Sequence, residues 1–313
     1  MESEQGNQIK SKNLHKPPLL LAFFRFIFRF IFRYVGCLFP RVVGRWSYRL
    51  WFQTHRSSVI PQREQNWLKA ATRIEVVELA INEWGLETLP VMTYYWENEH
   101  GENAPLVMLL HGWTGRGSQL GGFAEPLLKQ GFRVLAFDNH AHDNTPGKST
   151  HLFIQSAVQC ALAKKFGPIY AIITHSFGGM VTAYSFQRGL QTQKIVCVSS
   201  PSYFDFLLAR FSSSLHLPQS IQNYMVSRFK KEYGDDMMER ISSSNTAKKL
   251  GHIPALIIHD EEDQDVPISE SELLHQAWPN SKFIRTQGLG HRRILYDADV
   301  IQSSVNFLKL DKS

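Results

Sequence analysis

From residue 72 onward, short apolar runs alternate with segments long enough to form helices, and this alternation most constrains the fold. Proline, glycine or polar residues bound each run, which is typical of strands. Strands that alternate with helices form a mostly parallel central sheet with helices on both faces, so the sequence predicts an α/β fold. The predicted strands are 73–81, 90–97, 105–111, 132–138, 168–174, 194–200, 254–260 and 281–287, and the predicted helices include 118–130, 151–166, 177–190 and 268–278.

One interval, residues 201–252, is far longer than a crossover between two strands requires. It is rich in aromatic and aliphatic residues, among them Tyr203, Phe206, Phe211 and Phe229. We expect it to form a small helical cap over the edge at which the parallel strands end. Such a cap would give a lipophilic lining to a site at that edge, although ordinary core packing uses the same residue types.

Residues 19–39 and 41–52 are both amphipathic, because an arginine at every fourth position marks one face of a helix. A helix that spans a membrane would bury these arginines at a cost of about 3 kcal/mol each near the centre. A secretory signal does not carry so interrupted an apolar run. We expect residues 19–52 to lie on an anionic membrane surface; packing on the protein's own body or on a second copy is the alternative. The arginines are Arg25, Arg29, Arg33, Arg41, Arg45 and Arg49.

The N-terminal segment also carries the basic charge of the chain. Residues 1–63 hold eleven Lys and Arg against two Glu, a charge of +9, so a total of +6 leaves −3 on the other 250 residues. The larger part of the chain is therefore mildly acidic, and we expect no nucleic-acid partner. Three widely spaced cysteines fit neither a disulfide framework nor a zinc site. They indicate a reducing compartment, so we expect a cytoplasmic protein that is peripheral at the membrane.

These patterns divide the 313 residues into five parts. The expected parts are a disordered start, 1–18; a basic amphipathic helical extension, 19–63; the first part of the α/β domain, 64–200; the helical cap insertion, 201–252; and the second part of the α/β domain, 253–313. The start is assigned as disordered because it is polar and ends in two prolines.

Reactive side chains follow the ends of the predicted parallel strands. Because such strands end at one edge of the sheet, we expect these side chains to meet there. The stretches are "LLHGWTGRGS" (109–118), "FDNHAHDNTPGKST" (137–150), "THSFGG" (174–179), "HDEEDQDVP" (259–267) and "GLGHRRIL" (288–295).

With these stretches in place, the chain resembles the α/β-hydrolases from about residue 72 to 309. The stretch from Thr174 to Gly178 is similar to the nucleophile elbow of that family, small-x-Ser-x-Gly between a strand and a helix, with Ser176 at its centre. The turn His111-Gly112-Trp113 resembles the one that supplies an oxyanion amide. Thr174 departs from the family's preferred glycine, and we expect its branched side chain to displace the elbow slightly.

The resemblance also implies the rest of a Ser-His-Asp triad. "HDEEDQDVP" places Asp263 at the acid position, and "GLGHRR" places His291 as the base that takes the serine proton. The backbone N–H groups of Trp113 and Phe177 would stabilise the oxyanion. Asp265 competes for the role of the acid, although the spacing between the acid and the following Val-Pro favours Asp263.

The remaining polar residues at this edge receive structural roles. Thr174, Gly178, His111 and Gly112 would support the elbow and the oxyanion turn, with His175 likewise orienting a loop. Residues 260–262 are otherwise expected to form a solvated loop. We expect no metal at His140 and His142, because no second cluster with ligand spacing accompanies them.

The expected function is that of a serine hydrolase that cleaves a small-molecule carboxylic ester, with a lipophilic group, through an acyl-enzyme and without a cofactor. Thioester or amide hydrolysis would use the same residues, so the choice of an ester rests on the family. A different class stays open as well, a non-catalytic protein with a hydrolase fold that acts at a membrane or as a partner module.

Overall fold

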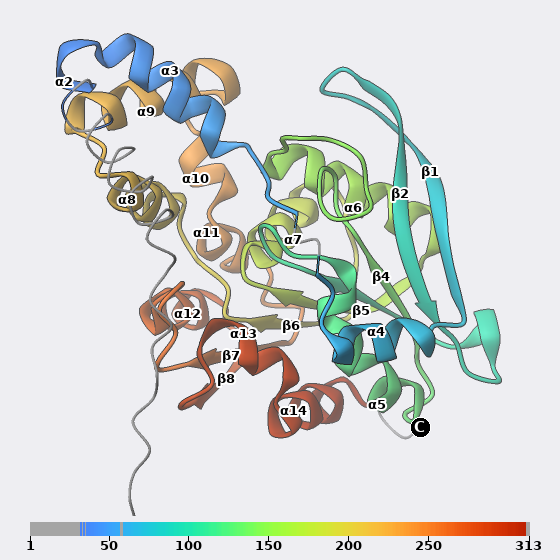
Figure 1. The fold of residues 1–313 in the computed structure, drawn as a ribbon. Helices are drawn as coiled ribbons and strands as arrows, with labels where there is room; N and C mark the ends of the chain where they lie inside the picture. The colour runs from blue at the N-terminus through green and yellow to red at the C-terminus, as the bar shows by residue number, and fades with distance from the viewer. Residues whose placement is uncertain (1–31, 33, 35, 57–58, 311–313) are drawn as a thin grey trace, which may run out of the picture.

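An eight-stranded, mostly parallel sheet forms the centre of the computed structural model, which describes residues 32, 34, 36–56 and 59–310 (Figure 1). Strands β1 and β2 form an antiparallel hairpin at one edge, and β2 is also antiparallel to β4. All the other neighbours are parallel, in the order β4-β3-β5-β6-β7-β8. The strands are β1 Arg73–Glu83, β2 Leu86–Trp96, β3 Leu106–Leu110, β4 Arg133–Phe137, β5 Ile169–His175, β6 Lys194–Val198, β7 Ala255–Asp260 and β8 Ser281–Thr286.

The central strands are mostly apolar because both of their faces are covered. Every residue of β3 and β7 is buried. Successive side chains point to opposite faces, so Ile172 and Ile173 of β5 enter two different hydrophobic cores. The edge strand β1 instead alternates buried and exposed residues over 77–82. The predicted parallel sheet with two covered faces is confirmed.

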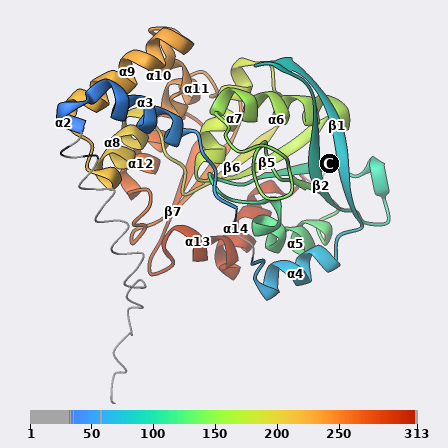
Figure 2. The ribbon, with the colours of Figure 1, turned by 45° about the horizontal axis from the view of Figure 1, so that its top comes forward.

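Helices cover both faces of this sheet, as Figure 2 shows. One core contains side chains of α6 (Leu152–Phe166), α7 (Phe177–Gln187) and α12 (Ile268–Ala277). The other contains side chains of α5 (Ala124–Leu128) and α14 (Ala298–Leu308). Two short elements, α13 (Gly290–Arg293) and the 3₁₀ helix η4 (Ile294–Tyr296), connect β8 to α14.

The predicted helix over 118–130 is divided in the structure. A 3₁₀ helix, η3 (Gly117–Phe123), precedes α5, and it packs on α4 (Gln62–Lys69). A Cβ atom at Gly121 would lie 2.8 Å from Cβ of Trp67, so the close approach of α4 requires glycine there. Glycine is a poor helix former, which accounts for the tighter, irregular first part.

The long interval 201–252 forms four helices that share the first core. The buried side chains Ile221, Met225 and Phe229 lie on one face of α9. In Figure 1 these helices lie to one side of the sheet, beyond β6. The helices are α8 (Phe204–Leu215), α9 (Gln219–Tyr233), α10 (Met237–Ile241) and α11 (Ser243–Ala247).

The helix α3 (Pro40–Trp51), which follows the short α2 (Gly36–Leu38), packs on α9 through one of its faces. A Cβ atom at Gly44 would lie only 2.6 Å from the ring of Tyr224. The hydroxyl of Tyr48 donates a hydrogen bond to Glu232 at 2.9 Å. The inner face of α3 therefore packs on the protein's own body, as in the alternative considered for residues 19–52.

Other N-terminal predictions lie outside the described residues, namely the disordered start 1–18 and the helix over 19–31. In the described part of the chain, none of the helices combines the length and the apolar character that crossing a bilayer demands.

Candidate active site

Ser176 stands between β5 and α7 in a strained backbone conformation, with φ of 53° and ψ of −127°. A residue with a side chain rarely adopts a positive φ, so the turn depends on its neighbours. A Cβ atom at Gly178 would lie 2.7 Å from the carbonyl oxygen of His111, so only glycine fits there. The side chain of Thr174 is buried, and its hydroxyl donates to the carbonyl of Val196 at 3.3 Å. The branched side chain of Thr174 is thus accommodated in the interior, and Ser176 adopts the strained turn with threonine at this position.

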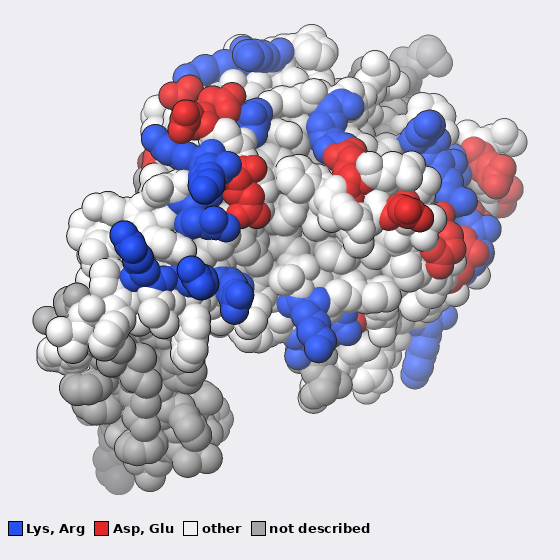
Figure 3. Space-filling model, turned by 90° about the horizontal axis from the view of Figure 1, so that it is seen from above, with Lys and Arg blue, Asp and Glu red and all other residues white. Residues whose placement is uncertain are grey.

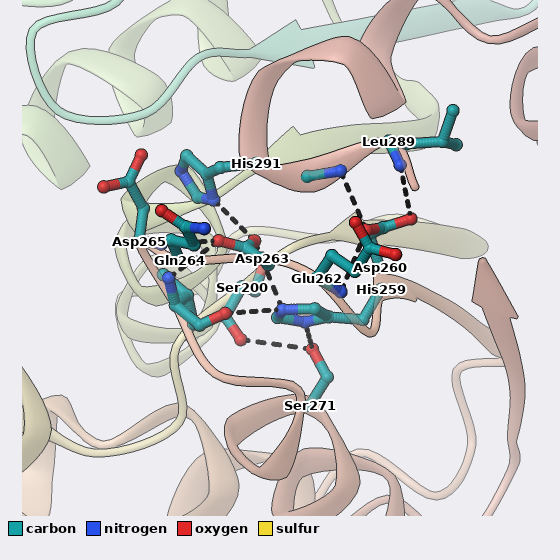
Figure 4. Close-up of polar contacts among 12 residues, drawn as sticks. Ser200, His259, Asp260, Glu262, Asp263, Gln264, Asp265, Ser271, Leu289 and His291 are labelled. Atoms are coloured by element: carbon teal, nitrogen blue, oxygen red, sulfur yellow. Dashed lines mark hydrogen bonds and ion pairs between the residues drawn. The ribbon is translucent and has the colours of Figure 1, made fainter. Parts of the chain in front are cut away.

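His291 and Asp263 form a hydrogen bond, although 27 residues separate them in the sequence. Nδ1–H of His291 donates to Oδ2 of Asp263 at 2.7 Å (Figure 4). The same oxygen lies 3.3 Å from Nε2 of His259, and Oδ1 accepts from the backbone N–H groups of Asp265 and Val266. Burial alone would raise the pKa of the Asp263 carboxyl, but the hydrogen bonds from His259 and His291 outweigh it and hold that pKa well below its usual range. The carboxylate is therefore charged and oriented toward His291.

Asp265, the competing acid, faces elsewhere. Its carboxylate is half exposed and pairs with Arg210 at 2.5 Å. The structure thus brings Asp263, and not Asp265, into contact with His291.

Asp260 is buried at the end of β7, so the expectation that residues 260–262 form a solvated loop is wrong for this residue and holds only for Glu261 and Glu262. Its Oδ1 accepts from the backbone N–H of Gly290 at 2.8 Å, and its Oδ2 accepts from that of Leu289 at 3.0 Å (Figure 4). Burial opposes ionisation, but these N–H groups and the hydroxyl of Thr286 lower the pKa of the Asp260 carboxyl. Asp260 therefore holds the turn that carries His291. The sequence offered one signal for this role: Asp260 is the last residue of a predicted parallel strand, where functional polar groups commonly lie.

Two buried histidines fasten the loops around Ser176. Nε2–H of His175 donates to the carbonyl of His291 at 2.9 Å, and the two rings lie 4.7 Å apart. His111 accepts from the backbone N–H of Asn139 through Nε2, so its Nδ1–H donates to the carbonyl of Gly112 at 2.7 Å. Burial lowers the pKa of His175 to about 3 and that of His111 well below its usual value. Both are therefore neutral near pH 7.

The turn formed by residues 111–113 approaches Ser176 closely. A Cβ atom at Gly112 would lie 2.8 Å from Cβ of Ser176, so a glycine is required. Neither the backbone N–H of Trp113 nor that of Phe177 reaches an acceptor among the described residues. The next N–H, of Thr114, is instead bound by Nε2 of His142 at 3.1 Å, while Nδ1 of His142 contacts the carbonyl of His140. Both ring nitrogens of His142 thus bind backbone groups of the loops.

Sequence reasoning missed a buried ion pair beside this turn. Nε of Arg116 lies 2.7 Å from a carboxylate oxygen of Glu64, and the hydroxyl of Ser118 donates to the same oxygen at 2.8 Å. The side chains are 7% and 1% exposed. No sequence motif connects two residues so far apart. The available signal was only that Glu64 lies in the first turn of a short helix.

Ser176 and His291 line one cavity of about 760 Å³. Within the described part of the chain the serine hydroxyl makes no hydrogen bond, to His291 or to any other group. The cavity is bounded on one side by Phe206, Leu207 and Phe211 of α8. It is large enough for a ligand of the size of a small lipid or drug.

Comparison with known proteins agrees with this architecture. Residues 105–236 match the family model of the alpha/beta hydrolase fold. A search of curated proteins found no match. Among solved structures, an esterase from Pyrococcus furiosus is 20% identical with a TM-score of 0.60, over 82% of this chain and 97% of that one.

Two further solved structures are similar over nearly the same part. Est1E from Butyrivibrio proteoclasticus, with ferulic acid bound, is 18% identical with a TM-score of 0.56, over 74% of this chain and 96% of its own. A thermophilic esterase from Thermogutta terrifontis is 17% identical with a TM-score of 0.53, over 75% of this chain and 98% of its own. At these identities the likeness concerns the fold.

Proposed function

Because the chain has the α/β-hydrolase fold, the resemblance noted in its sequence, we propose that it is a serine hydrolase that cleaves a carboxylic ester through an acyl-enzyme. One observation carries this proposal. Ser176, on its strained turn, and His291, to which Asp263 is hydrogen-bonded, border the same cavity.

In the proposed reaction, Nε2 of His291 takes the proton of the Ser176 hydroxyl as the oxygen attacks the ester carbonyl. The charged carboxylate of Asp263 accepts from Nδ1–H, which leaves Nε2 free as the base and stabilises the imidazolium that forms. His291 then returns the proton to the departing alcohol. Water repeats the sequence on the acyl-enzyme and releases the acid.

The proposed oxyanion hole consists of the backbone N–H groups of Trp113 and Phe177, which flank Ser176. Their lack of other acceptors among the described residues supports this role, because a donor aimed at a developing charge must be available. His111 and His142 supply rigidity, since each binds the backbone of the turn that carries Trp113.

The ester rather than the thioester or amide is favoured by the esterases among the similar structures. A lipophilic group on the substrate is supported by the aromatic side chains of α8 at the cavity. The alternative class, a non-catalytic module, would retain the fold and have no use for an ionised Asp263 oriented on His291.

A fluorophosphonate probe tests the proposal directly, because it phosphonylates a serine only where a base and an oxyanion hole activate it. We expect the wild type to be labelled at Ser176, as read by peptide mass spectrometry. The Ser176→Ala variant, with an unchanged circular dichroism spectrum, is expected to stay unlabelled. A folded wild type that resists the probe would support the non-catalytic alternative.

A further inference from the structure

The cavity around Ser176 carries more positive charge than its ion pairs neutralise. Two of its arginines are compensated, Arg116 by Glu64 and Arg210 by Asp265. Among the described residues that line the cavity, Glu64 and Asp265 are the acidic ones. The arginines that line it are Arg56, Arg63, Arg116, Arg210 and Arg292.

The three remaining cations are held in place without being neutralised. Nη2 of Arg56 donates to the backbone carbonyls of Thr145 and Gly147 at 2.7 and 2.9 Å. The guanidinium of Arg63 lies 3.5 Å from the centre of the Tyr296 ring. Arg292 directly follows His291 and has no ion-pair partner in the part of the chain that the structure describes. Carbonyl dipoles and an aromatic face orient a guanidinium but leave its charge available.

Two of the three cations without an acidic partner come from other elements than the apolar side chains of α8. Phe206, Leu207 and Phe211 belong to α8, whereas Arg63 belongs to α4 and Arg292 to α13. In both Figure 1 and Figure 2, α8 and α4 lie on opposite sides of α13. A substrate whose carbonyl reaches Ser176 would thus meet an apolar wall in one direction and cations in the other.

We propose that the substrate is an anionic ester, with an apolar acyl chain against α8 and a carboxylate or phosphate on the alcohol side near Arg63 and Arg292. This inference rests on the proposed hydrolase function and adds the substrate class to it. Guanidinium groups bind carboxylates and phosphates by paired hydrogen bonds, so both anions belong to the class.

Three esters of one acyl chain test it: 3-hydroxypropyl, 2-carboxyethyl and 2-phosphoethyl octanoate. We expect kcat/KM to be about tenfold higher for at least one anionic ester than for the neutral one at low salt, and the ratio to fall as salt screens the attraction. The carboxylate and phosphate arms identify the anion. Arg63→Gln and Arg292→Gln should each lower the ratio about threefold, and the lysine replacements should restore part of it. Lys164→Gln, an exposed charge away from the cavity, should keep the wild-type ratio.

A ratio near one for both anions, or a ratio that neither arginine variant changes, would overturn the anionic substrate. Fluorophosphonate labelling of Ser176 separates this failure from failure of the hydrolase itself. If Ser176 is labelled but the protein shows no preference for an anionic ester, only the proposed substrate class is overturned and the proposed hydrolase function stands.

The outer face of α3 supports a second inference, independent of the first. Two of its large apolar side chains are well exposed, Val42 by 56% and Trp46 by 62%. The preceding Phe39 is 59% exposed and Leu38 of α2 is 75% exposed. On a helical wheel, Arg41, Arg45 and Arg49 form the stripe next to them. Residues 36–56 contain no acidic residue.

These arginines have no ion-pair partner among the described residues. Lys and Arg side chains, with some Asp and Glu among them, lie over the side of the molecule where α3 and α9 lie (Figure 3). An apolar stripe beside a basic stripe complements a bilayer interface, in which acyl chains lie below anionic headgroups. A second copy placed symmetrically on this face would bring like charges together. We therefore propose that α3 docks its outer face on an anionic membrane surface while its inner face stays on α9.

Sedimentation with phosphatidylcholine vesicles of 0–40% phosphatidylserine tests this, with the full chain throughout. Binding should rise with the anionic lipid and fall with salt. Both Trp46→Ala and the triple variant Arg41→Gln/Arg45→Gln/Arg49→Gln should weaken binding at least about fivefold. The matched control Lys164→Gln/Lys165→Gln/Lys282→Gln removes the same charge elsewhere and should bind as the wild type does. Equal binding by all four proteins, or self-association in analytical ultracentrifugation that Trp46→Ala abolishes, would overturn the membrane surface.

Discussion

His175 donates a hydrogen bond from its side chain to the backbone carbonyl of His291, so the residue before the elbow serine holds the residue proposed as its base. Burial lowers the pKa of His175 to about 3, which keeps its ring neutral and its single N–H directed at that carbonyl. We therefore expect His175 to act through its position and not to exchange protons in the proposed reaction.

Replacing His175 should therefore impair turnover more than substrate binding. We expect His175→Phe to lower kcat about tenfold on an activated ester with little change in KM, because His291 loses its second anchor. His175→Gln, which retains a donor, should recover part of the loss. Neither variant should move the acid limb of the pH profile of kcat/KM, since His175 does not titrate between pH 5 and 8. A displaced limb would identify His175 as a group that exchanges protons.

Ser176→Ala and His291→Ala should each reduce hydrolysis of a p-nitrophenyl ester by at least about 10³-fold, because acylation requires both groups. The assay uses purified variants of unchanged melting temperature. Activity above a tenth of the wild type in either variant would exclude the proposed pair.

Asp263→Asn should cost far more activity than Asp265→Asn. The asparagine amide cannot stabilise an imidazolium, whereas Asp265 contacts Arg210 at the surface. We expect a loss of about 10³-fold for the first variant and less than threefold for the second, in kcat/KM. The reverse order would assign the acid to Asp265.

Stability should fall as the pH is lowered from 7 to 5. Burial lowers the pKa of His175 to about 3 and of His140, His142 and His151 to about 4, below the value near 6.5 of an unfolded chain. The unfolded state therefore binds protons first, and the free energy of unfolding drops below pH 6.5 by up to about 1.4 kcal/mol per pH unit for each such histidine. Asp138, whose pKa burial raises to about 6, opposes this only in part. Urea titrations at pH 7.5, 6.0 and 5.0 measure the slope, and a flat profile would contradict it.

A chain-length series of p-nitrophenyl esters tests the lipophilic wall. We expect kcat/KM to rise from acetyl to octanoyl, and Phe211→Ala to reduce the rise, since an apolar lining favours an apolar acyl group. A preference for acetyl would assign the aromatic residues of α8 to core packing alone.

The sheet was predictable because its signal is local. The buried strands are short and mostly apolar runs, of which Leu106–Leu110 is apolar at every position, and a parallel sheet covered on both faces is the arrangement that buries such runs. The positions of Ser176, Asp263 and His291 were predictable for a related reason, since each follows a strand end. What failed was side-chain environment. Asp260 is acidic like its exposed neighbours Glu261 and Glu262, and the groups that bind its carboxylate, in Thr286 and in the turn that carries His291, belong to a segment distant in sequence.

Partners distant in sequence were likewise beyond reach. The hydrogen bond from His175 to His291 and the ion pair of Arg116 with Glu64 join segments that no local pattern connects. The helix α3 was predicted as amphipathic, but its division into a face on α9 and an exposed face depends on Gly44, which lets Tyr224 approach.

The ion pair of Glu64 and Arg116 joins a helix that precedes the sheet to the site around Ser176. Glu64 precedes the first strand of the sheet, yet its carboxylate neutralises a cation buried beside the oxyanion turn. A protein shortened past this residue would keep every strand and every proposed triad residue, but it would leave a buried guanidinium without its counter-ion, typically a loss of about 3–5 kcal/mol. We therefore expect the smallest fragment that folds with this site intact to include α4, and His55, Arg56, Val59 and Pro61 between α3 and α4 form part of the wall of the cavity around Ser176.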